Sequence, residues 1–292
     1  MKTLVTGGCG FIGTHLVRKL LKLGHEVFVI DNLSSGSSDN MLEGAQYIVV
    51  DIRSDIDYLF EDIDCVFHLA AEARIQFSID NPKHTIDVNV SGTANVIEAC
   101  RLHKVPRFIN SSSSAVYGLT EEFPTNESIR TDCLNPYAAT KLAAEEIIHC
   151  YTKLYDITAF NLRYFNIFGE DSPVKGPYSL VVGLFLDQLS RSQSLTVVGD
   201  GSSCRDFIYV GDVVDANIAA MTAEPEIPST ILNIGSGQNI SVLAVAQALS
   251  NNITFVPSRI GEAKQTLADI TLVKRILGWE PKMMLLDWLN LT

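Results

Sequence analysis

The chain has 292 residues, of which 47% are hydrophobic and 19% are charged. That length and composition are typical of a globular protein with a large core and about two domains, and they exclude a disordered chain. The net charge of −12 disfavours binding to nucleic-acid phosphates and to anionic lipid surfaces. The longest apolar run, residues 180–186, is too short to cross a membrane, so we expect neither nucleic acid nor membrane as a partner.

Cysteine and histidine spacing bears on the compartment and on metals. The six cysteines include no CxxC pair, and the six histidines form no HxxxH or HExxH pattern. These spacings favour neither a disulfide framework nor a zinc site, so we expect reduced thiols and no metal. Lys2 is followed directly by a Gly-rich stretch rather than by the apolar core of a signal peptide. The expected location is therefore cytoplasmic.

Short apolar strands alternate with helices through the first half of the chain. The strands are expected at residues 2–6, 26–30, 47–50, 65–69, 108–111 and 158–162. The helices are expected at residues 11–23, where Gly24 is a stop signal, at 82–103 and at 137–155. This alternation predicts an α/β fold: a Rossmann-type, doubly wound parallel sheet covered by helices on both faces.

The pattern loosens after Tyr164, where loops lengthen and glycines and prolines cluster. We therefore expect a dinucleotide-binding Rossmann domain over residues 1–165, with a return of the chain to it around 205–235. Residues 166–292 are expected to form mainly a smaller α/β domain for the substrate.

A glycine-rich loop separates the first expected strand from the first helix. Gly8, Gly10 and Gly13 fit the spacing G-x-G-x-x-G, and Gly7 precedes them. Bare backbone at this point lets a pyrophosphate approach the helix N-terminus, where free N–H groups and the helix dipole favour anions. A structural turn is the alternative reading of such a loop.

Asp31 ends the second expected strand, 18 residues after Gly13. A carboxylate at this position accepts hydrogen bonds from an adenosine ribose and repels a 2′-phosphate. No Lys or Arg lies between Glu26 and Ile52, so the sequence favours NAD over NADP.

Tyr137 and Lys141 lie four residues apart on an expected helix and so share one face. A neighbouring ammonium group and a nicotinamide cation both stabilise a phenolate, so we expect a lowered tyrosine pKa and a base usable near neutral pH. Serines 111–114 follow the strand beginning at Phe108, which places their hydroxyls at the carboxyl edge of the sheet, where ligands bind.

Taken together, these segments resemble the extended short-chain dehydrogenase/reductase family, and in particular the UDP-sugar 4-epimerases. The matching segments span nearly the whole chain in family order: 6–13, 31–33, 51–52, 68–71, 89–93, 111–118, 137–141, 163–169 and 205–210.

The resemblance implies a role for individual residues. Tyr137 would be the catalytic base, Lys141 its partner, and Ser113 the hydroxyl that bonds the sugar 4-OH. The implied NAD contacts are Gly7, Gly10, Phe11, Ile12, Gly13, Asp31, Asn32, Asp51, Ile52, Leu69, Ala70, Ala71, Asn89, Ser111, Tyr137, Lys141 and Tyr164. The implied nucleotide-sugar contacts are Ser113, Asn166, Arg205, Arg259, Glu262 and Thr266.

Two positions separate this chain from related reactions. The similar 4,6-dehydratases carry Asp-Glu directly after the Ser/Thr, and the similar decarboxylases carry a Glu there, whereas this chain has Ser114 and Ala115. The resemblance therefore implies reversible oxidation at C4 of a UDP-hexose, through a transient 4-keto sugar, with retained NAD. The small residue at the implied gatekeeper position, Thr266, suggests that UDP-GlcNAc and UDP-GalNAc are also accepted.

Alternatives stay open at this point. Another nucleotide-sugar ketoreductase or epimerase would share the same motifs, and a non-catalytic NAD sensor would share the fold. The two long helices resemble a dimer-forming pair, and their apolar positions Val96, Ile97, Ile147 and Ile148 would form either the interface of a homodimer or core.

Overall fold

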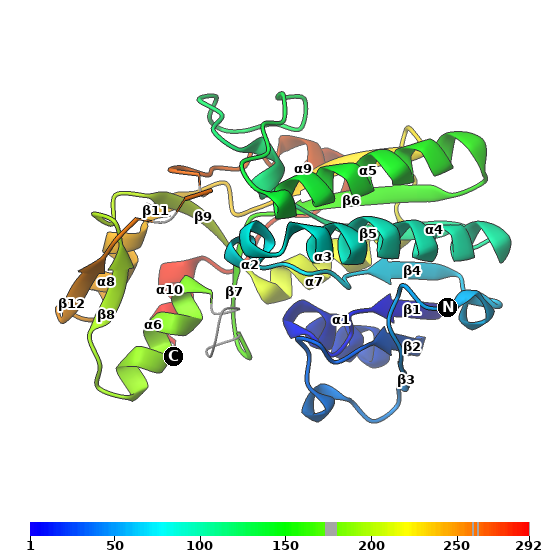
Figure 1. The fold of residues 1–292 in the computed structure, drawn as a ribbon, viewed down its shortest axis with the longest axis horizontal. Coiled ribbons are helices and arrows are strands. Elements are labelled where there is room, and N and C mark those ends of the chain that lie inside the picture. The colour runs from blue at the N-terminus through cyan, green and yellow to red at the C-terminus, as the bar shows by residue number, and fades with distance from the viewer. Residues whose placement is uncertain (173–179, 259, 262, 292) are drawn as a thin grey trace.

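The computed structural model describes residues 1–172, 180–258, 260–261 and 263–291 (Figure 1). Its centre is a seven-stranded parallel sheet in the order β10-β6-β5-β4-β1-β2-β3. The bounds are β1 Lys2–Thr6, β2 Glu26–Asp31, β3 Gln46–Val49, β4 Cys65–His68, β5 Arg107–Ser113, β6 Thr158–Tyr164 and β10 Ser229–Ile234. The order reverses between β1 and β4, which is where an open α/β sheet binds ligands. The expected fold class is confirmed.

Helices cover both faces of this sheet because its strands are apolar on both sides. One face carries α1 (Phe11–Lys22), α7 (Val210–Thr222) and α9 (Thr271–Leu277), packed around Leu16, Val213 and Val273. The other carries α3 (Pro82–Ile86), α4 (Gly92–Leu102) and α5 (Pro136–Leu154), with Val96, Ile97 and Ile148 in the core. Short elements complete this half: α2 Ile75–Asp80 and the 3₁₀ turns η1 Ser38–Asn40, η2 Asp57–Phe60 and η4 Ser114–Tyr117.

The long helix expected over residues 82–103 is interrupted. A π-helical turn, η3 (Asp87–Ser91), separates α3 from α4. Such turns are rare and often lie at functional sites. Here the extra residue turns Asn89 inward toward the loop after β4, as described below.

The remaining segments form a smaller layer on the left of Figure 1. A three-stranded sheet has the order β11-β9-β7, and β12 pairs with β8. The bounds are β7 Asn166–Phe168, α6 Val181–Ser190, β8 Leu195–Val198, β9 Cys204–Tyr209, β11 Asn239–Ser241, α8 Val242–Leu249, β12 Ile253–Val256 and α10 Leu285–Leu289. Between β9 and β11 the chain crosses to the large sheet and back, since α7 covers α1 and β10 extends the sheet beyond β6.

Candidate active site

A cavity of about 1660 Å³ opens at the carboxyl ends of the parallel strands and reaches the smaller layer. Typical sites for one small ligand measure roughly 300–1,000 Å³, so this cavity can hold a dinucleotide and a second nucleotide together. Among the described residues, the expected contacts all line it except Asn89. Arg259 and Glu262 lie outside the described residues.

The glycine loop forms one wall. Gly7 has φ +73°, and a Cβ there would stand 2.7 Å from the Ala70 nitrogen. A Cβ on Gly13 would stand 2.1 Å from the Gly7 carbonyl oxygen. Only glycine therefore lets this turn close against the neighbouring strand and the start of α1, and the resulting bare backbone is the cradle that a pyrophosphate needs.

Asp31 closes the far end of the cavity beside this loop. Its two carboxylate oxygens accept hydrogen bonds from the backbone nitrogens of Cys9 (2.9 Å) and Leu33 (2.8 Å). The carboxylate is thereby fixed, and each oxygen keeps a lone pair for a ribose hydroxyl.

Arg53 lines the cavity and was not predicted from the sequence, because it directly follows Ile52, the end of the segment that contains no Lys or Arg. Its guanidinium donates to Asp51 at 2.7 Å and to Asp87 at 2.5 Å, and Arg53 holds the pKa of Asp51 well below its usual range. Asn32 also donates to Asp51, at 2.8 Å. Since two carboxylates neutralise Arg53, the preference for NAD over NADP that we inferred from Asp31 is unaffected.

A buried relay positions the loop after β4. The Ala70 nitrogen donates to the Thr6 hydroxyl at 3.2 Å, which leaves that hydroxyl to donate to His68 Nδ1 at 2.8 Å. His68 Nε2 then donates to Thr93 at 2.9 Å. Burial, and secondarily the charge of Lys141, lower the pKa of His68 to about 3. This histidine is therefore a neutral structural link, and the motif at residues 68–71 owes its geometry to it.

Asn89 differs from expectation, because it lies behind the cavity wall. Its side-chain oxygen accepts from the Glu72 nitrogen at 2.7 Å, and its side-chain nitrogen donates to the Glu72 oxygen and to Thr140, both at 2.9 Å. The side chain thus fastens the loop after β4 to α5. The π-helical turn creates this arrangement, which periodicity alone does not reveal.

The N-terminal turn of α5, which carries Tyr137, is fixed by Asn135, Pro136 and Ser78. The Asn135 side chain caps the helix by accepting from the Ala138 nitrogen at 2.8 Å, and Pro136 occupies its first turn. Ser78 accepts from the Tyr137 nitrogen at 3.1 Å. Tyr137 therefore enters the cavity from a fixed turn.

The three expected catalytic residues meet at the edge of β5. Ser113 lies beside the Tyr137 side chain in the cavity, and Lys141 Nζ donates to the Ser111 carbonyl at 2.8 Å. The Ser111 hydroxyl in turn donates to Tyr164 at 3.2 Å. A hydroxyl, a phenol and an ammonium group thus share one buried surface, which is the arrangement needed to move a proton to or from a bound hydroxyl.

Burial shifts the pKa values of both Tyr137 and Lys141, while the expected lowering of the Tyr137 pKa by a nicotinamide cation stays a prediction. Burial raises the pKa of Tyr137, and the hydrogen bond from Ser113 offsets this only in part. Burial lowers the pKa of Lys141 to about 8, while the charge of Glu145 raises it. Lys141 Nζ donates to the Ser111 carbonyl, and burial, which disfavours the phenolate, is the larger cause of the shift in the Tyr137 pKa.

The opposite wall carries the expected nucleotide-sugar contacts. Asn166 Nδ2 donates to the Asp206 carbonyl at 3.0 Å and to the Thr266 hydroxyl at 3.2 Å, and the Asp206 nitrogen donates to the same hydroxyl at 3.0 Å. Arg205 Nη1 donates to the Cys204 and Lys264 carbonyls, each at 3.1 Å. The structure therefore brings Asn166, Arg205 and Thr266 together around Asp206, a residue that sequence reasoning did not single out.

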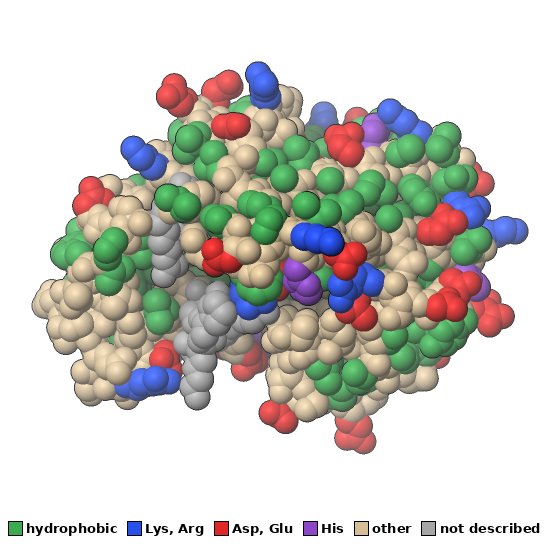
Figure 2. Space-filling model, viewed as in Figure 1, with side chains coloured by type: hydrophobic (Ala, Val, Ile, Leu, Met, Phe, Trp, Pro, Cys, Tyr) green, Lys and Arg blue, Asp and Glu red, His purple; other side chains and the backbone are tan. Residues whose placement is uncertain are grey.

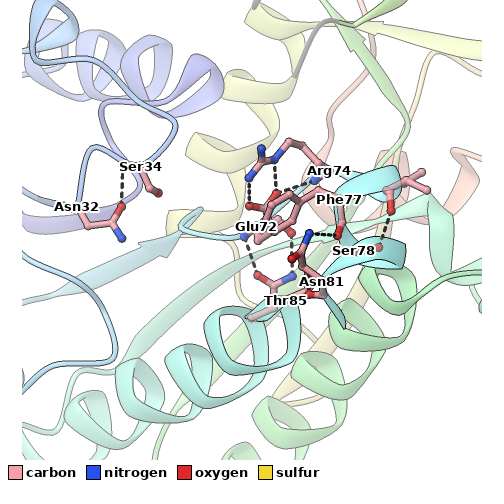
Figure 3. A network of polar contacts seen from close by, with 10 residues as sticks. Asn32, Ser34, Glu72, Arg74, Phe77, Ser78, Asn81 and Thr85 are labelled. Carbon is pink, nitrogen blue, oxygen red and sulfur yellow. Dashed lines mark hydrogen bonds and ion pairs between the residues drawn. The ribbon is translucent and has the colours of Figure 1, made fainter. Parts of the chain in front are cut away.

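The wall next to Tyr137 also holds a charged pair that sequence reasoning missed. Arg74 donates through Nε and Nη2 to the two oxygens of Glu72. Figure 3 shows Arg74 lying over Phe77 with its guanidinium turned to Glu72; the guanidinium carbon stands 3.9 Å from the ring centroid. The sequence does contain a signal for this pair, because Glu72 and Arg74, two residues apart and opposite in charge, directly follow the Ala70-Ala71 motif.

Comparison with known proteins places this site in a family. Residues 3–235 match the sequence profile of the NAD dependent epimerase/dehydratase family. The chain belongs to that family. A relative from Mycolicibacterium smegmatis, named UDP-glucose 4-epimerase, is 33% identical, and the match covers 98% of this chain and 96% of the relative.

Two solved structures share the fold of this family member closely. The UDP-glucose 4-epimerase of Thermotoga maritima, crystallised with UDP-glucose, has a TM-score of 0.96 and 32% identity, and the match covers 100% of this chain and 97% of that one. The UDP-N-acetylglucosamine 4-epimerase of Methanobrevibacter ruminantium, in complex with UDP-N-acetylmuramic acid, has a TM-score of 0.91 and 32% identity, with coverage of 96% and 93%.

The cofactor of this family fits the described residues. The glycine cradle would hold the pyrophosphate of NAD, Asp31 the adenosine ribose, and Lys141 with Tyr137 the nicotinamide end. Of the residues that the structure describes, no three His, Cys, Asp or Glu side chains gather as a metal site would require. No helix in the same part of the chain is long and apolar enough to cross a membrane.

Proposed function

We propose that this protein is an NAD-dependent 4-epimerase of UDP-hexoses that interconverts UDP-glucose and UDP-galactose. One observation carries the proposal: Ser113, Tyr137 and Lys141 share one cavity with the glycine cradle and with Asn166, Arg205 and Thr266. The positions after Ser113 hold Ser114 and Ala115, so no acid or base stands there for elimination or decarboxylation. The names of the relatives and of the solved structures agree with this reaction.

The chain's own residues perform the proton chemistry. Tyr137 takes the proton of the sugar 4-hydroxyl, and Ser113 bridges that hydroxyl and the phenol. NAD, which the glycine cradle, Asp31 and Lys141 would hold, would supply the reversible hydride acceptor for C4 of the sugar. The positive charge of an oxidised nicotinamide would offset the burial that raises the pKa of Tyr137. Arg205 and Asn166 hold the nucleotide while the sugar turns.

Thr266 supports a wider substrate range. Its hydroxyl already accepts two hydrogen bonds, from Asn166 and from the Asp206 nitrogen, so its own proton remains available as a donor. The residue lines the cavity and is small. We infer that it donates to the carbonyl of a 2-acetamido group, and that UDP-GlcNAc and UDP-GalNAc are also substrates.

Incubation with UDP-Glc and with UDP-GlcNAc separately, without added cofactor and followed by NMR of the anomeric protons, tests both statements. Conversion of each sugar to its 4-epimer is expected. Tyr137→Phe should abolish turnover while keeping bound NAD, and Thr266→Tyr should remove activity on the N-acetylated sugar and spare UDP-Glc. Equal loss on both sugars would contradict the role of Thr266, and a 4-keto-6-deoxy product would overturn the epimerase assignment.

We also propose that the protein is a homodimer through α4 and α5. The apolar positions Val96, Ile97 and Ile148 are fully buried in the monomer and Ile147 packs against them, so they are core. Hydrophobic side chains nevertheless gather over this face (Figure 2), and Leu102 and Leu154 are more than half exposed. A monomeric mass in solution at micromolar concentration would contradict this proposal.

We further propose that the protein works in the cytoplasm. All six cysteines are unpaired, and Cys9, Cys65 and Cys100 are buried, as expected for a reducing compartment. Fractionation of the source cells with an antibody to the chain would test the location.

A further inference from the structure

A buried ion pair lies directly beneath the catalytic residues. Glu145 is one helical turn beyond Lys141 on α5, and Arg163 is on β6. Arg163 donates to the two carboxylate oxygens, through Nε at 2.9 Å and Nη2 at 2.6 Å. The two side chains are only 2% and 3% exposed. Removing one partner of such a pair leaves an uncompensated buried charge, which destabilises the protein. The neighbouring groups that the pair contacts therefore indicate its role.

The pair holds the middle serine of the catalytic strand. The Ser112 hydroxyl donates to Glu145 Oε1. Side chains alternate along a strand. Fixing the Ser112 side chain on the α5 face of the sheet therefore also sets the orientation of Ser111 and Ser113. Ser113 reaches Tyr137, and the Ser111 carbonyl receives Lys141 Nζ. The position of the catalytic hydroxyl and the anchor of the catalytic amine therefore depend on one carboxylate.

The remaining contacts of Arg163 keep the pair in place. Its guanidinium lies over the Tyr117 ring, 4.8 Å from the centroid. Within the described chain its Nη1 has no hydrogen-bond partner, so the aromatic face is what receives that side of the cation. Tyr117 is in turn fixed by a 2.6 Å hydrogen bond to Asn233.

We propose that the Glu145–Arg163 pair is a positioning device for the active site: it sets the strand from Ser111 to Ser113, and its carboxylate, one helical turn from Lys141, supplies the counter-charge that keeps Lys141 an ammonium group. This inference concerns the site of the proposed epimerase and rests on that function for its kinetic consequence.

The other groups facing Lys141 do not supply this counter-charge. On α5 itself burial raises the pKa of Tyr137, so without a neighbouring cation its phenol carries no charge, and on β6 the pKa of Tyr164 is raised to about 12 for the same reason. His68 on β4 is neutral, since its pKa lies near 3. Arg163 carries the same sign as Lys141. Among the described residues around it, Glu145 is what opposes the desolvation of the amine.

Direct titration of Lys141 tests the counter-charge without any need for turnover. The protein is labelled with [ε-13C]lysine, and the Lys141 resonance is assigned by its loss in Lys141→Arg. We expect Glu145→Gln to lower the titration midpoint of Lys141 by about one pH unit or more, as the loss of a nearby opposite charge does. Ser112→Ala keeps both charges and is expected to leave that midpoint in place. An unchanged midpoint in Glu145→Gln overturns the counter-charge role.

Kinetics test the positioning role. Ser112→Ala should lower kcat several-fold with an unmoved alkaline limb of the pH–rate profile, whereas Glu145→Gln should lower kcat and move that limb to lower pH. A Ser112→Ala enzyme with wild-type kcat overturns the positioning role. If Glu145→Gln folds poorly, Glu145→Gln combined with Arg163→Gln avoids the unpaired buried charge. Because Arg163 has the same sign as Lys141, a smaller downward shift of the Lys141 midpoint is expected in the double variant, and no downward shift overturns the counter-charge role. A wild type inactive on every UDP-hexose would refute the proposed function, while the NMR titration would still decide the counter-charge.

Discussion

Asp206 offers a stringent test of how the substrate wall is built. It is fully buried, and its carboxylate accepts four hydrogen bonds. Oδ1 accepts from the nitrogen and the hydroxyl of Ser236, both at 2.7 Å. Oδ2 accepts from the nitrogens of Gly237 and Ala268, both at 3.0 Å. These bonds tie β9 to the segments after β10 and before α9.

Asp206→Asn keeps the shape of the side chain and replaces one oxygen by an NH₂ group. If the amide oxygen faces Ser236, the NH₂ faces two backbone N–H groups that lose their acceptor. Each buried donor left without a partner costs about 1–3 kcal/mol, so the free energy of unfolding should fall by about 2–6 kcal/mol. The Asp206 backbone also hydrogen-bonds Asn166 and Thr266. In Asp206→Asn we therefore expect KM for the UDP-sugar to rise and the amount of bound NAD to change little.

Asp212→Asn is the matched control. Asp212 is also buried, but a single oxygen, Oδ2, accepts both of its backbone hydrogen bonds, from Lys282 at 2.9 Å and Met283 at 3.0 Å. The amide oxygen can replace it, so the expected loss is below about 1 kcal/mol. Urea unfolding measures both variants. Equal losses in the two, or a loss below about 1 kcal/mol in Asp206→Asn, would refute the reasoning.

Three further predictions follow from the cofactor end and from Lys141. Gly13→Ala should abolish NAD retention, because its Cβ would stand 2.1 Å from the Gly7 oxygen, whereas Gly24→Ala, with nothing within 4 Å, should retain the cofactor; absorbance of the purified proteins decides this. Asp31→Asn should weaken NAD at least about tenfold in calorimetry, since an amide oxygen cannot accept from both the Cys9 and the Leu33 nitrogens; unchanged affinity would contradict the ribose role. The folded pKa of Lys141, about 8, lies below its unfolded value, so the unfolded chain binds more protons than the folded one above pH 8. The free energy of unfolding of the wild type relative to Lys141→Met should therefore rise from pH 8 to pH 10, and a fall in this difference would contradict the burial of the charge.

The sequence by itself determined the elements and the chemistry carried by local patterns. Apolar strands between amphipathic helices specify a parallel sheet, because such strands need cover on both faces. Gly7 and Gly13 predict the tight turn at the start of α1, because a side chain at either position would collide with the neighbouring backbone. The pairing of Tyr137 with Lys141 can be predicted from the sequence, since residues four apart on a helix share one face.

Only the tertiary structure decided what supports these residues. Glu145 and Arg163 are 18 positions apart, and Asp206 bonds Ala268 across 62 positions. No period or motif links such pairs, because the strand order and not the chain brings them together. The raised pKa of Tyr137 and the withdrawal of Asn89 behind the cavity wall have the same origin. Desolvation and hydrogen-bond partners are properties of the packed surroundings, and these exist only once the chain has folded.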